Sequence, residues 1–342
     1  MAEAVEAVTV AREPGSGQRF LNSAFRRLCQ VCAAGALVLV VFIVLRIALS
    51  AAPSLREQGV SFLTGTTWDP NKGVYSIRPE IWGTLYTSIL ALVLGTVLGV
   101  AAALFLAEGY LGAMVYDLLK AVGLQHKPVW KRLPAQVESV LRNLVELLAA
   151  IPSVVYGLWG IFVVIPAIRP ACNWLYSHLG WLPIFSSPLA GPGVLPAVIV
   201  LSIMILPTIT AIGRHALVSV PEKLRMAAYG LGATRWESIF GVLLPTAARG
   251  IFGGVVLAFG RALGETMALA MLVGNANRIG LSLFSPANTL AALLANNFPE
   301  AGPKTVPVLM YAALVLLAIT LAVNVAGALI LQRASANLEG GK

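Results

Sequence analysis

Charged residues are scarce in this chain. Of its 342 residues only 11% are Asp, Glu, Lys or Arg, whereas 58% are hydrophobic. An ordinary soluble domain carries about twice this charged fraction. The composition therefore excludes a typical soluble domain and predicts an integral membrane protein.

The sequence also lacks the motifs of most enzymes and metal proteins. It contains no GxxxxGK[ST] phosphate-binding loop, and therefore no ATPase motif of its own. Cys29 and Cys32 form a CxxC pair, but no second pair completes a zinc site. His126, His178 and His215 lie in different segments. We expect no catalytic residue, no metal site and no cofactor in this chain.

Six apolar stretches are long enough to cross a bilayer, whose hydrocarbon core needs about 20 helical residues. We expect an all-α protein with spans at residues 31–49, 84–107, 144–167, 194–213, 251–273 and 308–331. Gly95 and Gly99 are four residues apart and predict a face of the second span on which another helix packs closely. Pro152 predicts a kink near the inner end of the third span.

The basic residues predict the orientation of the spans. Lys and Arg residues outside them lie mostly in the N-terminal tail, in the connections after spans two and four, and at the C-terminus. The positive-inside rule then places both termini in the cytoplasm of a multi-pass cell-membrane protein. The net charge of +9 is spread over these segments. This spread favours contact with anionic membrane lipid and argues against nucleic acid as a partner.

The chain divides into three parts. Residues 1–28 include a polar stretch with a Pro-Gly-Ser-Gly sequence and predict a disordered cytoplasmic tail. Residues 29–332 form the six-span domain, and residues 333–342 form a cytoplasmic C-terminal tail. Residues 108–142 carry mixed charges, so this segment fits either an insertion or an amphipathic surface segment.

An arginine and a glutamate, Arg261 and Glu265, lie one helical turn apart in an apolar segment. A charge at the centre of a membrane helix costs about 2.5–3.5 kcal/mol, so such residues usually face a protein interior or an aqueous path. Counted from Ile251, Arg261 lies about 15 Å deep, near the bilayer midplane. The pair, with Thr266 beside it, predicts a polar pathway. The alternative is a buried ion pair that only fixes helix packing.

A second motif lies within the expected cytoplasmic loop at residues 214–250. Its helix formers and glycines predict one short helix that ends near Gly230 and Gly232, and a second from about Thr234 to Pro245. Two short helices with an aromatic face predict an element that binds in a groove on another protein. An ordinary amphipathic hairpin is the alternative. The residues that we assign to this contact are Glu222, Met226, Ala227, Ala228, Gly232, Trp236 and Pro245.

The spacing of this loop resembles a known family. Two alanines, then Gly232, then nine residues before Val-Leu-Leu-Pro resemble the "EAA" loop of permease subunits of binding-protein-dependent ABC importers. The resemblance implies that residues 221–245 dock into an ATPase subunit. Met226 stands where the family pattern has Glu, although Glu222 lies one turn away.

Residues 260–268, Gly-Arg-Ala-Leu-Gly-Glu-Thr-Met-Ala, look like the signature of phosphate-specific permeases. Together with residues 67–70, 83–85 and 146–160, they make the chain similar to PstC-type subunits from about residue 62 to residue 331. The resemblance implies a type I ABC importer permease fold and a phosphate path shared with a PstA-type permease. It also implies two PstB-type ATPase subunits, which bind ATP and Mg²⁺, and a PstS-type phosphate-binding protein outside the cell.

The chemistry of Arg261 agrees with this resemblance, because a guanidinium offers bidentate donors that match phosphate oxygens. Glu265 lies four residues after Arg261 and leans back toward it along the same helix face, so we expect the two to pair in a closed state until phosphate competes. Three alternatives remain open. They are a permease for another oxyanion, an ion-coupled secondary carrier with Glu265 as its proton site, and a non-transporting membrane scaffold or sensor.

Overall fold

A computed structural model describes residues 15–121 and 133–339, and this part of the chain is helical almost throughout. Its β structure is one isolated bridge between Asp69 and Val74. Two π-helical turns, η1 (Gly160–Val164) and η3 (Ile239–Leu243), and two 3₁₀ turns, η2 (Pro183–Phe185) and η4 (Phe298–Glu300), interrupt the α-helices. The α-helices are α1 (Ser16–Gln58), α2 (Ser61–Thr64), α3 (Arg78–Ala107), α4 (Tyr110–Ala121), α5 (Leu133–Leu148), α6 (Ser153–Trp159), α7 (Ile165–Leu179), α8 (Val194–Val218), α9 (Glu222–Gly230), α10 (Arg235–Ser238), α11 (Leu244–Leu263), α12 (Met267–Leu272), α13 (Leu290–Asn297) and α14 (Thr305–Glu339).

Six helical segments are long and apolar enough to cross a membrane, which confirms the expected number within the described residues. They are Gly17–Gln58, Arg78–Ala107, Ser153–Leu179, Val194–Val218, Arg235–Leu263 and Thr305–Arg333. The fourth segment, α8, is the most buried of the six and forms the centre of the molecule.

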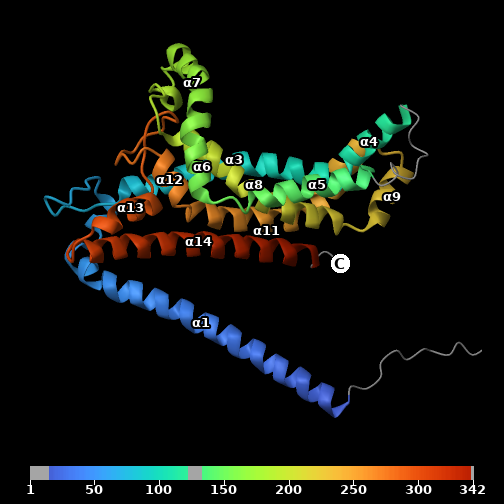
Figure 1. Ribbon diagram of the computed structural model, residues 1–342, viewed down its shortest axis with the longest axis horizontal. Coiled ribbons are helices and arrows are strands. Elements are labelled where there is room, and N and C mark those ends of the chain that lie inside the picture. The colour runs from blue at the N-terminus through green and yellow to red at the C-terminus, as the bar shows by residue number, and fades with distance from the viewer. Residues whose placement is uncertain (1–14, 122–132, 340–342) are drawn as a thin grey trace, which may run out of the picture.

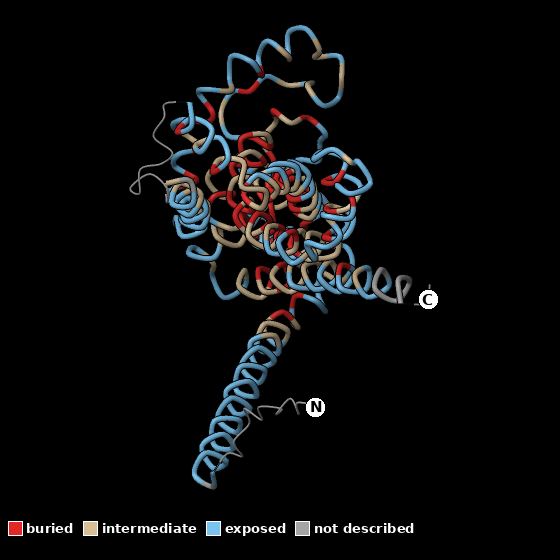
Figure 2. The backbone as a smooth tube through the Cα atoms, turned by 90° about the vertical axis from the view of Figure 1, so that its right-hand side faces the viewer, coloured by how far each residue is buried: buried red, intermediate tan, exposed pale blue. Residues whose placement is uncertain are grey.

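Four helices, α3, α8, α11 and α14, run side by side as a bundle (Figure 1). Helices α4 and α9 lie at one end, which we call the α9 end, and α13 lies at the other, the α13 end. Helix α7 stands crosswise to the bundle, and α1 turns beside α13 and runs away from the other helices. Figure 2 shows the buried residues gathered inside the bundle and α1 exposed along most of its length.

The contact between α3 and α8 is close because α3 presents glycines there. A Cβ atom at Gly95 would lie 2.9 Å from the side chain of Ile205, and one at Gly99 would lie 2.8 Å from that of Ile209. Thr210 also donates a hydrogen bond from Oγ1 to the carbonyl oxygen of Gly99 at 3.2 Å. The close-packing face that Gly95 and Gly99 predicted is therefore confirmed.

The third span, expected at residues 144–167, was placed too early. Helix α5 ends at Leu148, and Pro152 is the N-cap of α6. A proline has no N–H to donate, and its ring clashes with the carbonyl group four residues earlier, so the chain breaks here. The expected kink is a complete interruption, and the apolar segment runs over Ser153–Leu179.

The fifth span, expected at residues 251–273, begins and ends earlier, at Arg235–Leu263. The second loop helix does not stop at Pro245, because this proline lies in the first turn of α11, where a missing N–H is tolerated. At the other end Gly264 is the C-cap of α11, and α12 starts as a separate helix. Residues 251–273 are thus two helices.

The tails also differ from expectation. Helix α1 begins at Ser16, so residues 16–28 are helical and not disordered, and residues 1–14 lie outside the described residues. The side-chain Oε1 of Gln18 accepts a hydrogen bond from the N–H of Gly15 and caps the first turn. Helix α14 continues to Glu339, through most of the expected C-terminal tail, of which residues 340–342 lie outside the described part.

Residues 108–142 contain α4 and the first part of α5, which pack against each other. The described part of this segment is therefore helical, which fits both an amphipathic surface segment and an insertion. Residues 122–132, which join the two helices, lie outside the described residues.

The glycine contact leads to a first prediction. Replacement of Gly99 by Leu should destabilise the chain by about 1–3 kcal/mol, because the new side chain must displace Ile209 from a packed interface. Thermal unfolding of the purified protein in detergent measures the effect. Val97→Leu is the matched control, because Val97 lies on the exposed face of the same helix. Equal melting temperatures for the two variants would contradict this account of the interface.

Candidate functional site

Arg261 lies in the last turn of α11, and its side chain is exposed on the single chain. Among the described residues, no hydrogen bond or ion pair to its guanidinium is formed, and its charge acts electrostatically on Tyr156 of α6. An unpaired guanidinium at the end of an apolar helix is costly in lipid, so this face requires a polar surrounding or another protein surface.

Glu265 does not pair with Arg261 in this structure. Helix α11 ends at Leu263, so the two residues no longer face each other across one helical turn. The Oε1 atom of Glu265 instead accepts a long hydrogen bond of 3.5 Å from the N–H of Ala268, in the first turn of α12. A carboxylate at this position stabilises the start of a helix. The expected closed-state ion pair is therefore absent from the described residues.

Thr266 completes the turn between the two helices. It is the N-cap residue of α12, and its Oγ1 donates a hydrogen bond to the carbonyl oxygen of Gly264 at 3.1 Å. The structure thus brings Arg261, Glu265 and Thr266 together at one helix interruption. Glu265 and Thr266 shape the turn, and Arg261 alone presents a free charge.

Two motifs that lie far apart in the sequence meet at this interruption. Helix α12 packs on α6, where a Cβ atom at Gly157 would lie 2.7 Å from the sulfur of Met271, and one at Gly160 would lie 2.6 Å from Leu272. The 146–160 and 260–268 segments are therefore parts of one site.

Tyr156 is a functional candidate that the sequence analysis missed. Its ring is buried, and its Oη donates a hydrogen bond of 2.8 Å to the carbonyl oxygen of Leu148, the last residue of α5. This bond satisfies a carbonyl group that the break at Pro152 leaves without an intrahelical partner. Tyr156 thus holds α5 and α6 together beside the charge of Arg261.

Asn324 is a second missed candidate. It is the one amide residue between Thr305 and Leu331 of α14, and a Cβ atom at Gly260 would lie 2.9 Å from its Oδ1. Gly260 therefore leaves room for an amide directly before Arg261. A lone polar residue in an apolar span is the sequence signal that could have identified it.

The segment between α12 and α13 is fastened to the start of α3. The fully buried carboxylate of Glu80 accepts a hydrogen bond from Nδ2 of Asn288 at 3.4 Å. The N–H of Leu290 donates to Oγ1 of Thr84 at 2.9 Å. A Cβ atom at Gly83 would overlap the carbonyl oxygen of Asn288, so only glycine permits this approach. Residues 274–289 are thus held against α3 by buried polar contacts.

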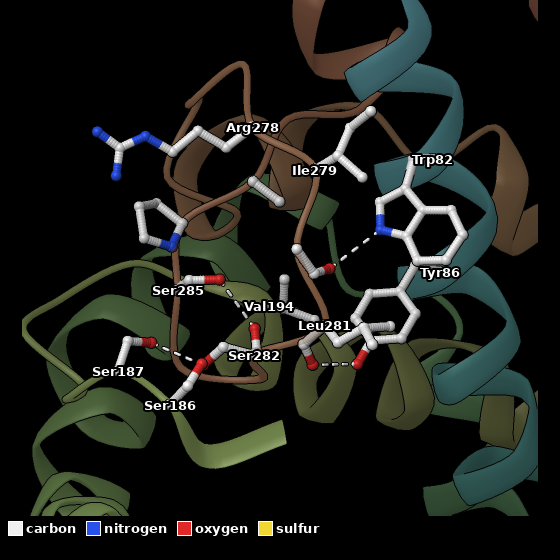
Figure 3. A pocket seen from close by; sticks show the side chains of 13 residues that line it. Trp82, Tyr86, Ser186, Ser187, Val194, Arg278, Ile279, Leu281, Ser282 and Ser285 are labelled. Carbon is white, nitrogen blue, oxygen red and sulfur yellow. Dashed lines mark hydrogen bonds between the residues drawn. The ribbon is translucent and has the colours of Figure 1, made fainter. Parts of the chain in front are cut away.

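A cavity of about 210 Å³ lies beside this segment (Figure 3). Trp82 donates from Nε1 to the carbonyl oxygen of Gly280 at 3.1 Å, and Tyr86 donates from Oη to that of Leu281 at 2.7 Å. Figure 3 shows the guanidinium of Arg278 directed away from these aromatic side chains. The hydrogen bonds of Trp82 and Tyr86 to this segment fix the course of residues 278–287 along the cavity.

The loop at the α9 end has the first short helix that the sequence predicted, whereas the second helix starts at Arg235 and continues through η3 into α11. Helix α9 ends at Gly230, and Gly232 has a φ of 87°, in the left-handed region that favours glycine. The N-cap Thr234 then starts α10 with a capping box. The N–H of Thr234 donates to Oε2 of Glu237 at 2.7 Å, and the N–H of Glu237 donates to Oγ1 of Thr234 at 3.3 Å.

Large apolar side chains are exposed on this loop. Leu231 at its tip is 89% exposed, Met226 is 61% exposed and Trp236 is 60% exposed. Ala228 is buried against the chain, whereas Glu222 and Ala227 face outward. Five of the seven assigned residues therefore face outward on this loop, and Ala228 anchors it to the rest of the chain. Pro245 lies apart from them in the first turn of α11.

Comparison with known proteins assigns the family. Residues 131–335 match the family described as "binding-protein-dependent transport system inner membrane component". The chain belongs to this family.

Its relatives include the phosphate transport system permease protein PstC of Xylella fastidiosa (strain 9a5c), which is 36% identical over 91% of this chain and 90% of the relative. The PstC protein of Haemophilus influenzae is 36% identical over 89% and 90% of the two chains. A probable PstC protein of Methanocaldococcus jannaschii is 32% identical over 83% and 85%. Among solved structures, an inward-facing MetNI methionine ABC transporter aligns with a TM-score of 0.48 and 18% identity, over 78% of this chain and 99% of that chain.

The bridge across the helix break leads to a second prediction. Tyr156→Phe removes the donor to Leu148, which should weaken the α5–α6 junction by about 0.5–1.5 kcal/mol. We expect faster amide hydrogen exchange at residues 148–155 than in wild type. Tyr176→Phe on α7 is the matched control, because its hydroxyl forms no hydrogen bond within the described residues. Equal exchange in Tyr156→Phe and wild type would show that the bond does not hold the junction.

Proposed function

We propose that this chain is the permease subunit of an ATP-driven inorganic phosphate importer. The observation that carries the proposal is the unpaired Arg261 guanidinium at the interruption between α11 and α12. The names of relatives that align with about nine-tenths of the chain support phosphate as the substrate. A guanidinium provides paired N–H donors for a tetrahedral oxyanion and keeps its charge at any working pH.

We infer a role for Glu265 that differs from the expected one. The carboxylate supports the first turn of α12 and leaves Arg261 free, so phosphate does not have to displace it from the arginine. Glu265 and Thr266 instead fix the turn that presents Arg261 to the path. Because Arg261 is exposed on the single chain, we infer that a homologous PstA-type permease completes the path on its other side.

We assign the remaining parts of the complex to the two ends of the bundle. The exposed apolar loop at α9–α10 docks into one of two PstB-type ATPase subunits, which bind the ATP and Mg²⁺ that this chain does not bind. The α9 end and both termini then lie in the cytoplasm, as the basic residues indicate. A PstS-type phosphate-binding protein delivers its ligand at the α13 end, outside the cell membrane.

Phosphate uptake by the reconstituted complex tests this function. In liposomes that contain this chain, its partner permease and ATPase subunits, with binding protein outside, uptake should require internal ATP. Arg261→Ala should reduce uptake by about a hundredfold, because an oxyanion in a low-dielectric path loses its compensating charge. Arg261→Lys should be intermediate, and Glu265→Gln should lose part of the activity through a weakened α12.

Arg249→Ala is the matched control, since it removes an arginine from the same helix away from the interruption. Each variant must assemble with its partners as wild type does. Uptake without ATP that collapses with the proton gradient would indicate a secondary carrier. Wild-type uptake by both Arg261→Lys and Glu265→Gln would reduce this pair to packing residues, and unchanged uptake without this chain would indicate a scaffold.

The ATPase contact gives a separate prediction. Gly232→Val places a branched side chain at a left-handed position, which costs about 1–2 kcal/mol and should reshape the loop. We expect loss of ATPase subunits when the permease is purified by a tag. Gly230→Ala is the control, because Gly230 has no left-handed φ and a Cβ atom there meets open space. Full ATPase recovery with Gly232→Val would exclude this loop as the docking element.

A further inference from the structure

Glu108 is a buried carboxylate at the end of α3. It is the C-cap residue of α3, which extends about 45 Å from the α13 end to the α9 end. Its side chain is only 2% exposed. A carboxylate buried to this degree is strongly unfavourable unless it is paired with cations and hydrogen-bonded.

Two arginines from the α9–α10 loop provide these partners. Arg225 of α9 donates from Nη2 to Oε1 of Glu108 at 2.7 Å. Arg235 of α10 donates from Nη2 to the backbone carbonyl oxygen of Glu108 at 2.8 Å and approaches Oε2 at 3.4 Å. One residue of α3 therefore binds both short helices, on either side of the turn at Gly232.

Aromatic side chains reinforce the same junction. The guanidinium of Arg235 lies 4.1 Å from the ring centroid of Tyr110, the first residue of α4. The ring of Tyr110 stacks on Trp236 of the loop at 6.1 Å and on Phe105 of α3 at 6.0 Å. Charge pairing and ring stacking thus fasten the loop to α3 and α4 together.

We propose that Glu108 is a positioning residue that couples the α9–α10 loop to α3, so that the loop and α3 move as one unit when ATPase subunits move. The proposal rests on the proposed function of the loop as the ATPase contact. It adds a specific set of contacts through which a movement of the loop is transmitted to the membrane domain.

At its other end, α3 contacts the segment that follows α12. Glu80, Gly83 and Thr84 of α3 hold residues 274–289, the segment that follows α12. Displacement of α3 by the loop therefore shifts this segment as well, at the opposite end of the bundle. Helix α11, which carries Arg261 in its last turn, also packs on α3, so displacement of α3 acts on the Arg261 turn as well.

The first test compares Glu108→Gln with wild type in the reconstituted complex. Gln keeps the size of the side chain but removes the charge that both arginines need. We expect phosphate transported per ATP hydrolysed to fall about tenfold or more, with ATP hydrolysis retained. Asp117→Asn is the matched control, because Asp117 is an exposed carboxylate on α4 with no partner in the described part of the chain. An unchanged ratio in Glu108→Gln would overturn the proposal.

A double variant separates coupling from folding. Glu108→Gln leaves two arginines without their carboxylate, and the variant could fail to assemble for that reason alone. Glu108→Gln with Arg225→Gln removes one of these unpaired cations. If Arg225 acts through Glu108, the coupling loss in the double variant is no larger than that of Glu108→Gln alone. Additive losses would show that the two residues act separately, which contradicts the proposal.

A distance measurement supplies a readout that packing alone would not change. Spin labels at Leu231→Cys on the loop and Val97→Cys on α3 are placed in a chain without its native cysteines. We expect one narrow distance distribution, equal with and without ATP and vanadate, and a broad, nucleotide-dependent one in Glu108→Gln. A nucleotide-dependent distance in the otherwise wild-type chain would show that the loop moves independently of α3.

The two proposals fail in different ways. If the wild-type complex takes up no phosphate with ATP, the proposed function is wrong. If wild type transports and Glu108→Gln keeps the same ratio and the same distance distribution, only the role of Glu108 is wrong.

Discussion

The close contact of α3 with α8 is the constraint on which the rest of the structure depends. Lipid offers no hydrophobic drive for helices to associate, so they rely on close packing of small residues. Gly95 and Gly99 bring the backbone of α3 against Ile205 and Ile209. Once α3 is fixed in this way, one end of it positions residues 274–289 and the other positions the α9–α10 loop through Glu108. Residues 274–289 and the α9–α10 loop are therefore both positioned by α3.

Polar chemistry is concentrated where helices are interrupted. A break in a membrane helix frees backbone groups that lipid cannot satisfy, so side chains must do so. Tyr156 satisfies the carbonyl group left at the end of α5, and Glu265 accepts an N–H at the start of α12. Arg261 lies near both of these helix interruptions. The side chains that form hydrogen bonds to the freed backbone groups therefore also make this part of an otherwise apolar layer polar.

The sequence predicted what depends on composition and local pattern, and it failed where distant contacts decide. Hydropathy identified six spans, and Gly95 with Gly99 identified the packing face of α3. Hydropathy does not detect helix ends inside an apolar run, which is why the chain break at Pro152 was expected only as a kink and the end of α11 at Gly264 was not predicted. The contacts of Glu108 with Arg225 and Arg235 join residues more than a hundred positions apart, so no local pattern indicates them.

The π-helical turn η3 sets the rotation of α11 relative to the loop. The N–H of Leu244 bonds the carbonyl oxygen of Ile239, and Pro245 follows directly, without an N–H of its own. Compared with an unbroken α-helix, this turn contains one additional residue, and one residue corresponds to roughly 100° about the axis. The side of the membrane domain that Arg261 faces is therefore determined by a single inserted residue some distance before it. The same proline prevents an ordinary α-helical bond at its own position, so it keeps this angular offset in place.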